Sequence, residues 1–534
     1  MMKKTRIIIA SALLLLTALL MTSCGGKSGE TGTVTDPGAA DSSENSDSAA
    51  EEQDYVYKSD NYTVDGYTAT ASKIAADSSE MAMGTVIYDF PEAGAENSIY
   101  EAHVSFDSAA SSAGIIFQAA ESTDYDGFSG YAFMLRDRRV YLYELTGSSF
   151  SGMITRELGV RVVERPKSGE GAWLRVVRDG NTYRMYFLDD AEDIEPWPEF
   201  EFVLTGGAGS GVGYIDNGQG AAFDSLSVST YDAPEKSAAS TYKNPVYSAT
   251  QAADPGVLKY NGKYYCYSTS AAIGYLVYES DDLVNWENKG QCCGEVWGID
   301  KSGYYWAPEV VMRNDKFYMI MSVDEHLGFA TSDSPLGPFV PEESWLFDDT
   351  IDGHVFIDDD GRAYLYYVSW RSGHEYGIYG CELSEDLLSV KEGTEVLLIK
   401  PESPWEKAEG GVTEGPFMLK HDGTYYLTYS GTGYTSWYYA VGYATSDNPL
   451  GEFVKYSANP VLSYTTKVYG PGHHSFTESP DGSELIIVYH AHKSSTEIHP
   501  RVLCIDRARF GRNKNGEIRL EIWGPTHTAE EYPH

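Results

Sequence analysis

The chain has 534 residues, of which 42% are hydrophobic and 13% aromatic, and this composition excludes a mainly disordered protein. Acidic residues outnumber basic ones by 79 to 39, so the net charge of −40 excludes a basic surface for nucleic acid and suits neutral or cationic partners. The 42 Tyr, 53 Gly and 22 Pro residues favour strands and turns and predict an all-β fold.

Residues 1–23 have the features of a signal peptide. Three basic residues precede the apolar run Ile7–Met21, whose 15 residues are too few to span a bilayer reliably. Small residues then precede Cys24. This ending resembles a bacterial lipoprotein signal, which implies cleavage before Cys24 and lipidation of that cysteine. An ordinary secretory signal with a chance cysteine is the alternative. The interpretation predicts a lipid-anchored protein of the bacterial cell envelope, on the periplasmic or extracellular face, whose only membrane contact is the lipid.

Residues 24–54 are rich in Ser, Gly, Ala and acidic residues and predict a disordered acidic tether. From residue 55 to 231, about ten short strands alternate apolar and polar residues, as in a two-sheet β-sandwich. One hairpin is predicted at Trp173–Tyr186, with Gly180 at its tip. The pattern is similar to concanavalin-like jelly rolls, some of which bind sugars, so a carbohydrate-binding module or a spacer is expected. Residues 232–241 form the predicted linker.

Five further cysteines lack the spacing of a zinc site. They are Cys266, Cys292, Cys293, Cys381 and Cys504. The vicinal pair Cys292 and Cys293 could form a strained disulfide, but two buried thiols are the favoured interpretation.

Residues 242–534 repeat one unit five times: a polar residue, a short apolar run, a turn and a Tyr-rich strand. The units begin near Asp254, Glu309, Asp352, Glu414 and His473. The segment Ala330–Gly337 also returns almost unchanged as Ala444–Gly451. Repeats of roughly 40–50 residues, each a four-stranded sheet, are typical of propeller blades. The sequence therefore predicts a five-bladed β-propeller.

The repeat has a chemical consequence, because the first strand of each blade lies nearest the propeller axis. We expect the five polar residues that open the units to converge on one funnel. Neighbouring carboxylates disfavour one another's ionisation, so at least one pKa should rise. A protonated acid beside an ionised base is what the cleavage of a glycosidic bond requires.

Five motifs carry a resemblance to a known family. They are Asp254-Pro255-Gly256-Val257, Trp306-Ala307-Pro308-Glu309, Ile351-Asp352, Thr413-Glu414-Gly415-Pro416 and Gly470-Pro471-Gly472-His473. In this order, within residues 242–525, they resemble glycoside hydrolase family 43. The resemblance implies a five-bladed propeller that hydrolyses pentosidic or related bonds with inversion. It implies Asp254 as general base, Glu414 as general acid, and Asp352 as the residue that tunes the pKa of the acid and orients the substrate.

The same resemblance implies roles for residues around these acids. Trp306 would be the aromatic wall of the sugar site, with packing between blades as the alternative. Arg501 would reach substrate hydroxyls, although a surface arginine is nearly as plausible. Glu309 stands where the family often has Asp and is interpreted as structural support.

His473 resembles an axial histidine that often contacts a calcium ion or its water shell. A structural Ca²⁺ in the channel is therefore compatible with the sequence, while no cofactor is required for the chemistry. Trp370, Tyr434 and Trp437 follow the Tyr-rich strands and are candidates for outer subsites.

The predicted protein is an inverting O-glycosyl hydrolase that acts on arabinose- or xylose-containing plant cell-wall polysaccharides or oligosaccharides. An α-L-arabinofuranosidase or a β-xylosidase is favoured, and arabinan- or galactan-directed activity stays open. The non-enzymatic alternative is a catalytically inactive glycan-binding lipoprotein of the cell surface. A fructan hydrolase is disfavoured because its Asn-Asp-Pro-Asn and Arg-Asp-Pro motifs do not occur.

Overall fold

The computed structural model of the chain describes residues 55–58, 62–71, 84–105, 111–121, 128–147, 154–163, 171–188, 197–205, 209–217, 219–232, 240–269, 274–294, 296, 303–513 and 516–534. The predicted signal peptide, the tether with Cys24 and most of the predicted linker lie outside these residues. In the described ranges we find no helix with the length and hydrophobicity that a membrane crossing requires.

The strands between residues 55 and 230 form two antiparallel sheets of seven strands each. In spatial order the first contains β1 (Tyr55–Lys58), β4 (Gly84–Asp89), β13 (Gly211–Asp216), β6 (Ser112–Glu121), β7 (Phe128–Arg136), β8 (Arg139–Gly147) and β9 (Ile154–Val162). The second contains β12 (Phe200–Val203), β11 (Thr182–Leu188), β10 (Ala172–Asp179), β5 (Asn97–Ser105), β14 (Ala221–Thr230), β3 (Thr68–Ala71) and β2 (Tyr62–Asp65).

One hydrophobic core joins the two sheets. Ile115 and Phe133 of the first sheet and Tyr100 and Leu174 of the second belong to it, and all four are fully buried. Along β5 every second residue is buried, which is the alternation that a strand with one face on a core requires. The hairpin predicted from the sequence is confirmed as β10–β11, in which Asp179 pairs with Thr182.

Five four-stranded sheets follow in chain order. Blade 1 has β16 (Ala253–Tyr260), β17 (Lys263–Thr269), β18 (Tyr275–Ser280) and β19 (Glu287–Cys293); blade 2 has β20 (Tyr305–Arg313), β21 (Lys316–Val323), β22 (His326–Ser332) and β23 (Val340–Pro341). Blade 3 has β24 (Thr350–Ile357), β25 (Ala363–Ser369), β26 (Gly377–Glu382) and β27 (Val396–Ile399); blade 4 has β28 (Thr413–His421), β29 (Thr424–Gly431), β30 (Ala440–Ser446) and β31 (Val454–Lys455). Blade 5 has β32 (Gly472–Glu478), β33 (Leu485–Ala491), β34 (Val502–Arg512) and β35 (Ile518–Trp523).

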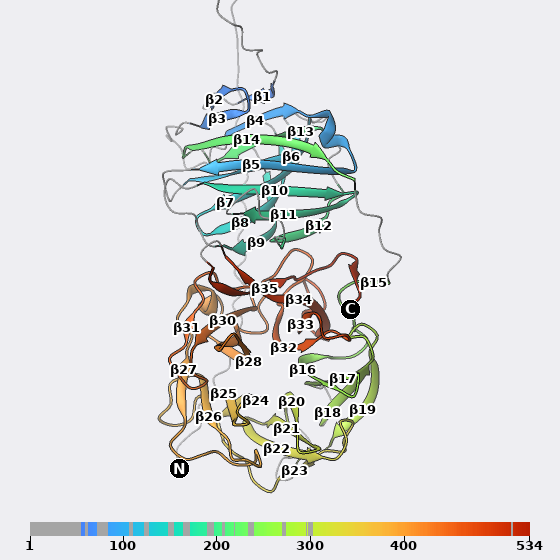
Figure 1. The fold of residues 1–534 in the computed structure, drawn as a ribbon, viewed down its shortest axis with the longest axis vertical. Coiled ribbons are helices and arrows are strands. Elements are labelled where there is room, and N and C mark those ends of the chain that lie inside the picture. Colours follow the sequence, from blue (N-terminus) through green and yellow to red (C-terminus); the bar gives the residue numbers. More distant parts are fainter. Residues whose placement is uncertain are drawn as a thin grey trace, which may run out of the picture. The chain divides into compact units, whose positions relative to one another are not determined.

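The blades close into a ring. The first strand of each blade contacts the first strand of the next, from β16 through β20, β24 and β28 to β32, and β32 contacts β16 again. In Figure 1 the blades follow one another around this ring from green to red. The predicted five-bladed propeller is confirmed. A short pair of β15 (Thr241–Tyr242) and β36 (Glu530–Glu531) joins the two ends of this part of the chain.

Helical structure is nearly absent from the described residues. It consists of two short 3-10 turns, η1 (Pro91–Gly94) and η2 (Pro404–Lys407). All five cysteines after Cys24 are buried free thiols, which agrees with the favoured interpretation of the vicinal pair.

Each innermost strand carries a β-bulge close to its start. The register with the second strand shifts between Ala253 and Gly256, Trp306 and Glu309, Ile351 and His354, Glu414 and Phe417, and Gly472 and His474. One residue of every bulge has a positive φ: Asp254 at 51°, Ala307 at 42°, Asp352 at 58°, Gly415 at 55° and His473 at 41°. Four of these residues are not glycine, and a left-handed backbone costs each of them about 1 kcal/mol or more. The bulges re-aim the side chains at one end of the five innermost strands.

Candidate active site

The bulges are linked from blade to blade by a repeated hydrogen bond. In four blades the backbone N–H of the bulged residue donates to a side chain at the end of the second strand of the preceding blade. These bonds join Ala307 to Thr269 Oγ1 (2.8 Å), Asp352 to Ser322 Oγ (3.0 Å), His473 to Ser430 Oγ (2.8 Å) and Asp254 to His490 Nδ1 (3.2 Å). In blade 4 the pattern changes, because Gly415 N donates to the carboxylate of Asp352 at 3.0 Å.

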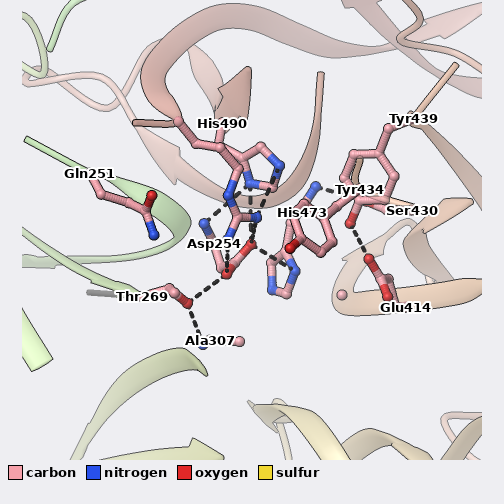
Figure 2. A network of polar contacts seen from close by, with 12 residues as sticks. Gln251, Asp254, Thr269, Ala307, Glu414, Ser430, Tyr434, Tyr439, His473 and His490 are labelled. Atoms are coloured by element: carbon pink, nitrogen blue, oxygen red, sulfur yellow. Dashed lines mark hydrogen bonds and ion pairs between the residues drawn. The ribbon is translucent and has the colours of Figure 1, made fainter. Parts of the chain in front are cut away.

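Asp254 is 7% exposed and is surrounded by hydrogen-bond donors. Arg501 donates from Nη1 to Oδ1 at 2.7 Å and from Nη2 to Oδ2 at 3.1 Å, and Thr269 Oγ1 donates to Oδ2 at 2.5 Å. The contacts that converge on this carboxylate are drawn in Figure 2. Burial favours the neutral acid, but Arg501, His473 and His490 outweigh it and hold the pKa of Asp254 well below its ordinary value. Asp254 is therefore an ionised carboxylate, which suits a base.

The surroundings of Glu414, unlike those of Asp254, favour the protonated form of the carboxyl group. Tyr439 donates its hydroxyl proton to Oε1 at 2.7 Å, and among the described residues this is the only side-chain hydrogen bond of the Glu414 carboxyl. Burial, with a contribution from the charge of Asp254, raises the pKa of Glu414 to about 7. Glu414 is therefore protonated below neutral pH, and the structure shows no side-chain hydrogen bond to its Oε2 among the described residues. This suits an acid.

Asp352 lies 6% exposed beside the acid. Its Oδ2 accepts the N–H of Gly415, the residue that follows Glu414. Burial first, and then the negative charges of Glu414 and Asp254, raise the pKa of Asp352 to about 7. The bond fixes the backbone that carries Glu414, so the geometry gives Asp352 an orienting position next to the acid.

His473 lies between two of these carboxyls. Its Nδ1 is 3.3 Å from Asp254 Oδ1 and 3.9 Å from Asp352 Oδ2. Within the part of the chain that the structure describes, no three His, Cys, Asp or Glu side chains are grouped to hold a metal ion. Calcium takes six to eight oxygen ligands, and one imidazole engaged with carboxylates does not fit that requirement. In the structure His473 therefore contacts the carboxyl groups of Asp254 and Asp352.

The expected convergence of all five polar residues is wrong for Glu309. The bulged residue of blade 2 is Ala307, and Glu309 lies two residues further along β20. There its carboxylate bonds to His354 Nδ1 at 2.8 Å and accepts the N–H of Val355 at 3.3 Å. Glu309 thus joins blades 2 and 3.

The predicted substrate-binding residues lie in different surroundings. Trp306 is partly exposed and stacks on Tyr304, with 5.5 Å between the ring centroids. Trp370 packs against the core between blades 3 and 4, which leaves it partly buried. Trp437 is 47% exposed. Arg501 is 5% exposed, and its two Nη atoms bind the carboxylate of Asp254.

Sequence reasoning missed three residues that touch the acids: Thr269, Tyr439 and His490. Thr269 and His490 stand at or next to the ends of β17 and β33. A comparison of second-strand ends between blades could have found them, because Ser322 and Ser430 occupy matching places. Tyr439 is fully buried, and its ring stacks on His490 with 5.6 Å between centroids. It belongs to no repeated motif, so nothing in the sequence pattern marked it.

The sequence profile of glycosyl hydrolases family 43 matches residues 242–514, and this range contains every residue of the site described above. The chain belongs to this family. The family 43 protein is thus a glycoside hydrolase. It is 31% identical over 306 residues to a β-D-galactofuranosidase of Aspergillus niger, a match that covers 52% of this chain and 83% of the relative. It is 29% identical over 278 residues to a xylosidase/arabinosidase of Bacteroides ovatus, covering 42% and 82%.

Among solved structures, the family 43 chain is similar to the crystal structure of a thermostable family-43 glycoside hydrolase. The identity is 41% and the TM-score 0.50, and the match covers 55% of this chain and 99% of that one.

Tyr439→Phe is expected to move the alkaline limb of the pH–rate profile to higher pH. The hydroxyl of Tyr439 stabilises the ionised form of Glu414 and so lowers its pKa. Without it the pKa of Glu414 rises, and the fall of kcat/KM that begins near pH 7 in the wild type begins later. The measurement is kcat/KM from pH 4 to 10 for both proteins. Tyr443→Phe removes another buried tyrosine hydroxyl from β30 and serves as the control. An unmoved limb contradicts the assigned bond.

Proposed function

We propose that this protein is an inverting glycosidase that removes arabinose or xylose residues from plant cell-wall polysaccharides or their fragments. The observation that carries the proposal is that the site contains one ionised carboxylate and one protonated carboxylic acid. Asp254 is held ionised by Arg501, and Glu414 has a pKa raised to about 7. Inverting hydrolysis uses one carboxylate as base and one carboxylic acid as proton donor.

In the proposed mechanism Asp254 accepts a proton from a water molecule as that water attacks the anomeric carbon. Glu414 donates its proton to the glycosidic oxygen as the bond to the leaving group breaks. Each turnover therefore leaves Asp254 protonated and Glu414 ionised, and exchange with solvent restores both. Asp352 holds the N–H of Gly415 and keeps Glu414 in place through the step.

The relatives support the choice of sugar. Beside those named above, the chain is 27% identical over 281 residues to an extracellular exo-α-(1→5)-L-arabinofuranosidase of Streptomyces chartreusis. Five-carbon sugars and furanose rings recur in these names. Arabinan- and galactan-directed hydrolysis stay within the proposal as alternatives. A catalytically inactive glycan-binding protein is disfavoured, since the acid and the base are both present with the protonation states that catalysis needs.

The test is hydrolysis of a panel of arabinan, arabinoxylan, xylan, galactan and the nitrophenyl glycosides of arabinofuranose, xylose and galactofuranose. Proton NMR of the first-formed sugar gives its anomeric configuration. We expect release of arabinose or xylose with inversion. An inverting site holds its carboxyls ~6.5–9.5 Å apart to admit the water, whereas a retaining site holds them ~5–5.5 Å apart. Retention of the anomeric configuration would contradict the role of Asp254. Release of galactofuranose alone would contradict the proposal that the released sugar is arabinose or xylose.

For residues 55–231 we propose a concanavalin-like jelly roll that binds carbohydrate or acts as a spacer. The two seven-stranded antiparallel sheets on one core support this. We also propose that Cys24 is lipidated and anchors the protein to the cell envelope. The sequence around the predicted cleavage site supports it, and metabolic labelling with a fatty acid in the wild type and in Cys24→Ala would test it. The calcium ion expected near His473 is not part of the proposal, because the described residues around this histidine do not fit one.

A further inference from the structure

One surface segment of the propeller displays aromatic rings that the mechanism does not use. The loop between β29 and β30, residues 432–439, contains four aromatic residues and no charged one. We call it the aromatic loop. Tyr434 is 38% exposed, and Trp437 and Tyr438 are each 47% exposed. Large aromatic side chains on a soluble surface cost free energy of hydration, and a cluster of them usually marks a binding site.

The aromatic loop contacts Glu414 directly and reaches Asp254 through Arg501. At its end Tyr439 donates a hydrogen bond to Glu414 at 2.7 Å. Near its start the ring of Tyr434 lies 4.6 Å from the guanidinium carbon of Arg501, which binds Asp254. Figure 2 shows Tyr434 and Tyr439 beside the acid and the base. The exposed rings of Trp437 and Tyr438 stand in the chain between these two anchored residues.

Local hydrogen bonds and ring contacts hold the exposed rings in place. Ser436 is buried, and its Oγ and carbonyl oxygen accept the N–H groups of Tyr438 at 3.1 Å and Tyr439 at 3.2 Å. Trp437 packs on Tyr469 and Tyr438 packs on Tyr464, with 5.2 Å between the ring centroids in each pair. A surface fixed in this way loses little conformational entropy when it binds a ligand.

We propose that the aromatic loop binds the sugar residues of a neutral polysaccharide chain on the leaving-group side of the scissile bond. The acid must protonate the leaving-group oxygen, so the leaving group passes on the side of Glu414, which the loop borders. Aromatic faces stack on the apolar faces of sugar rings. The uncharged loop of a chain with net charge −40 suits a neutral polymer and repels an anionic one. The inference rests on the proposed function and adds recognition of a polymer to it.

The experiment compares the double variant Trp437→Ala, Tyr438→Ala with the wild type on two substrates. One is the polysaccharide of the panel that the wild type hydrolyses fastest, and the other is the matching nitrophenyl glycoside, which has no sugar on the leaving-group side. We expect kcat/KM on the polymer to fall about tenfold or more relative to kcat/KM on the nitrophenyl glycoside. The change should lie in KM. Equal losses on both substrates, or none on the polymer, would overturn the inference.

Two controls separate recognition from folding. Val454→Ala removes an exposed apolar side chain, 66% exposed, from β31 at the outer edge of the same blade, and it should change neither activity. Trp437→Phe, Tyr438→Phe keeps both aromatic faces and should keep most of the polymer activity, even where the alanine variant is unstable. Loss of polymer activity in the phenylalanine variant as large as in the alanine variant would count against stacking.

A binding assay tests the aromatic loop independently of whether the protein hydrolyses any of the polysaccharides. Glu414→Gln protein is run in native gels that contain arabinan, arabinoxylan, xylan or galactan, with and without the two alanine substitutions. We expect one polymer to retard Glu414→Gln and to retard the triple variant less. If the wild type hydrolyses nothing, this assay still decides on the loop. Absence of retardation by any polymer, or equal retardation of both proteins, rejects the aromatic loop as a polysaccharide site.

Discussion

Glu414→Gln is expected to lower kcat/KM about 10³-fold on a polysaccharide or oligosaccharide and far less, about tenfold or under, on a nitrophenyl glycoside. A sugar alkoxide is a poor leaving group and needs the proton of Glu414. Nitrophenolate leaves without protonation, so its departure hardly depends on the acid. The glutamine is nearly isosteric and can still accept the hydrogen bond that Tyr439 donates to Oε1. The measurement is the ratio of the two losses.

The pH–rate profile provides a second readout of the same substitution. In the wild type, kcat/KM on the natural substrate should fall above pH 7 as Glu414 loses its proton, because the pKa of this acid is raised to about 7 and its protonated form is the active one. Glu414→Gln cannot ionise and should lose this limb. Asp352, whose pKa is also raised to about 7, keeps its own titration in the variant. Equal losses on both substrates, with the limb retained, would transfer the role of acid from Glu414 to Asp352.

Asp254→Asn is expected to lower kcat/KM by about 10³-fold or more on both substrates alike. The attacking water needs its base whether the leaving group is good or poor. Because the pKa of Asp254 is held well below its ordinary value, the wild type should keep its base ionised through the mildly acidic range. The measurement is kcat/KM on the same two substrates. A loss confined to the polysaccharide would contradict the assignment of Asp254 as the base.

The substitution at Asp254 also has a structural consequence. Arg501 is 5% exposed and donates to both carboxylate oxygens, so Asp254→Asn leaves a buried guanidinium without its counter-charge. Removing one partner of a buried ion pair costs about 3–5 kcal/mol. We expect a lower Tm, and kinetics must be measured well below it. Asp254→Glu keeps the charge and displaces the carboxylate by one methylene, so it should recover much of the Tm and little of the activity.

The sequence was sufficient to predict some of the residues of the site. Asp254, Asp352 and Glu414 stand in motifs that recur once per blade, and the propeller topology brings the start of every innermost strand to the same end of the ring. Periodicity and strand order were enough to predict that they meet. Alternation along strands such as β5 likewise predicted which face is buried, since side chains alternate with a period of two.

Only the tertiary structure decided the roles of neighbouring residues. Each bulge inserts a residue and changes which side chain faces the axis, so Ala307 takes the place expected for Glu309. Whether a carboxyl is ionised depends on groups far away in the chain: Arg501 for Asp254, and Tyr439 with burial for Glu414. The sequence by itself determined the all-β class, the repeat and the meeting of Asp254, Asp352 and Glu414, because local pattern and strand order encode them, and the resemblance to family 43 singled these three acids out. The protonation of those acids and the partners that hold them depend on distances between blades, and these exist only once the ring has closed.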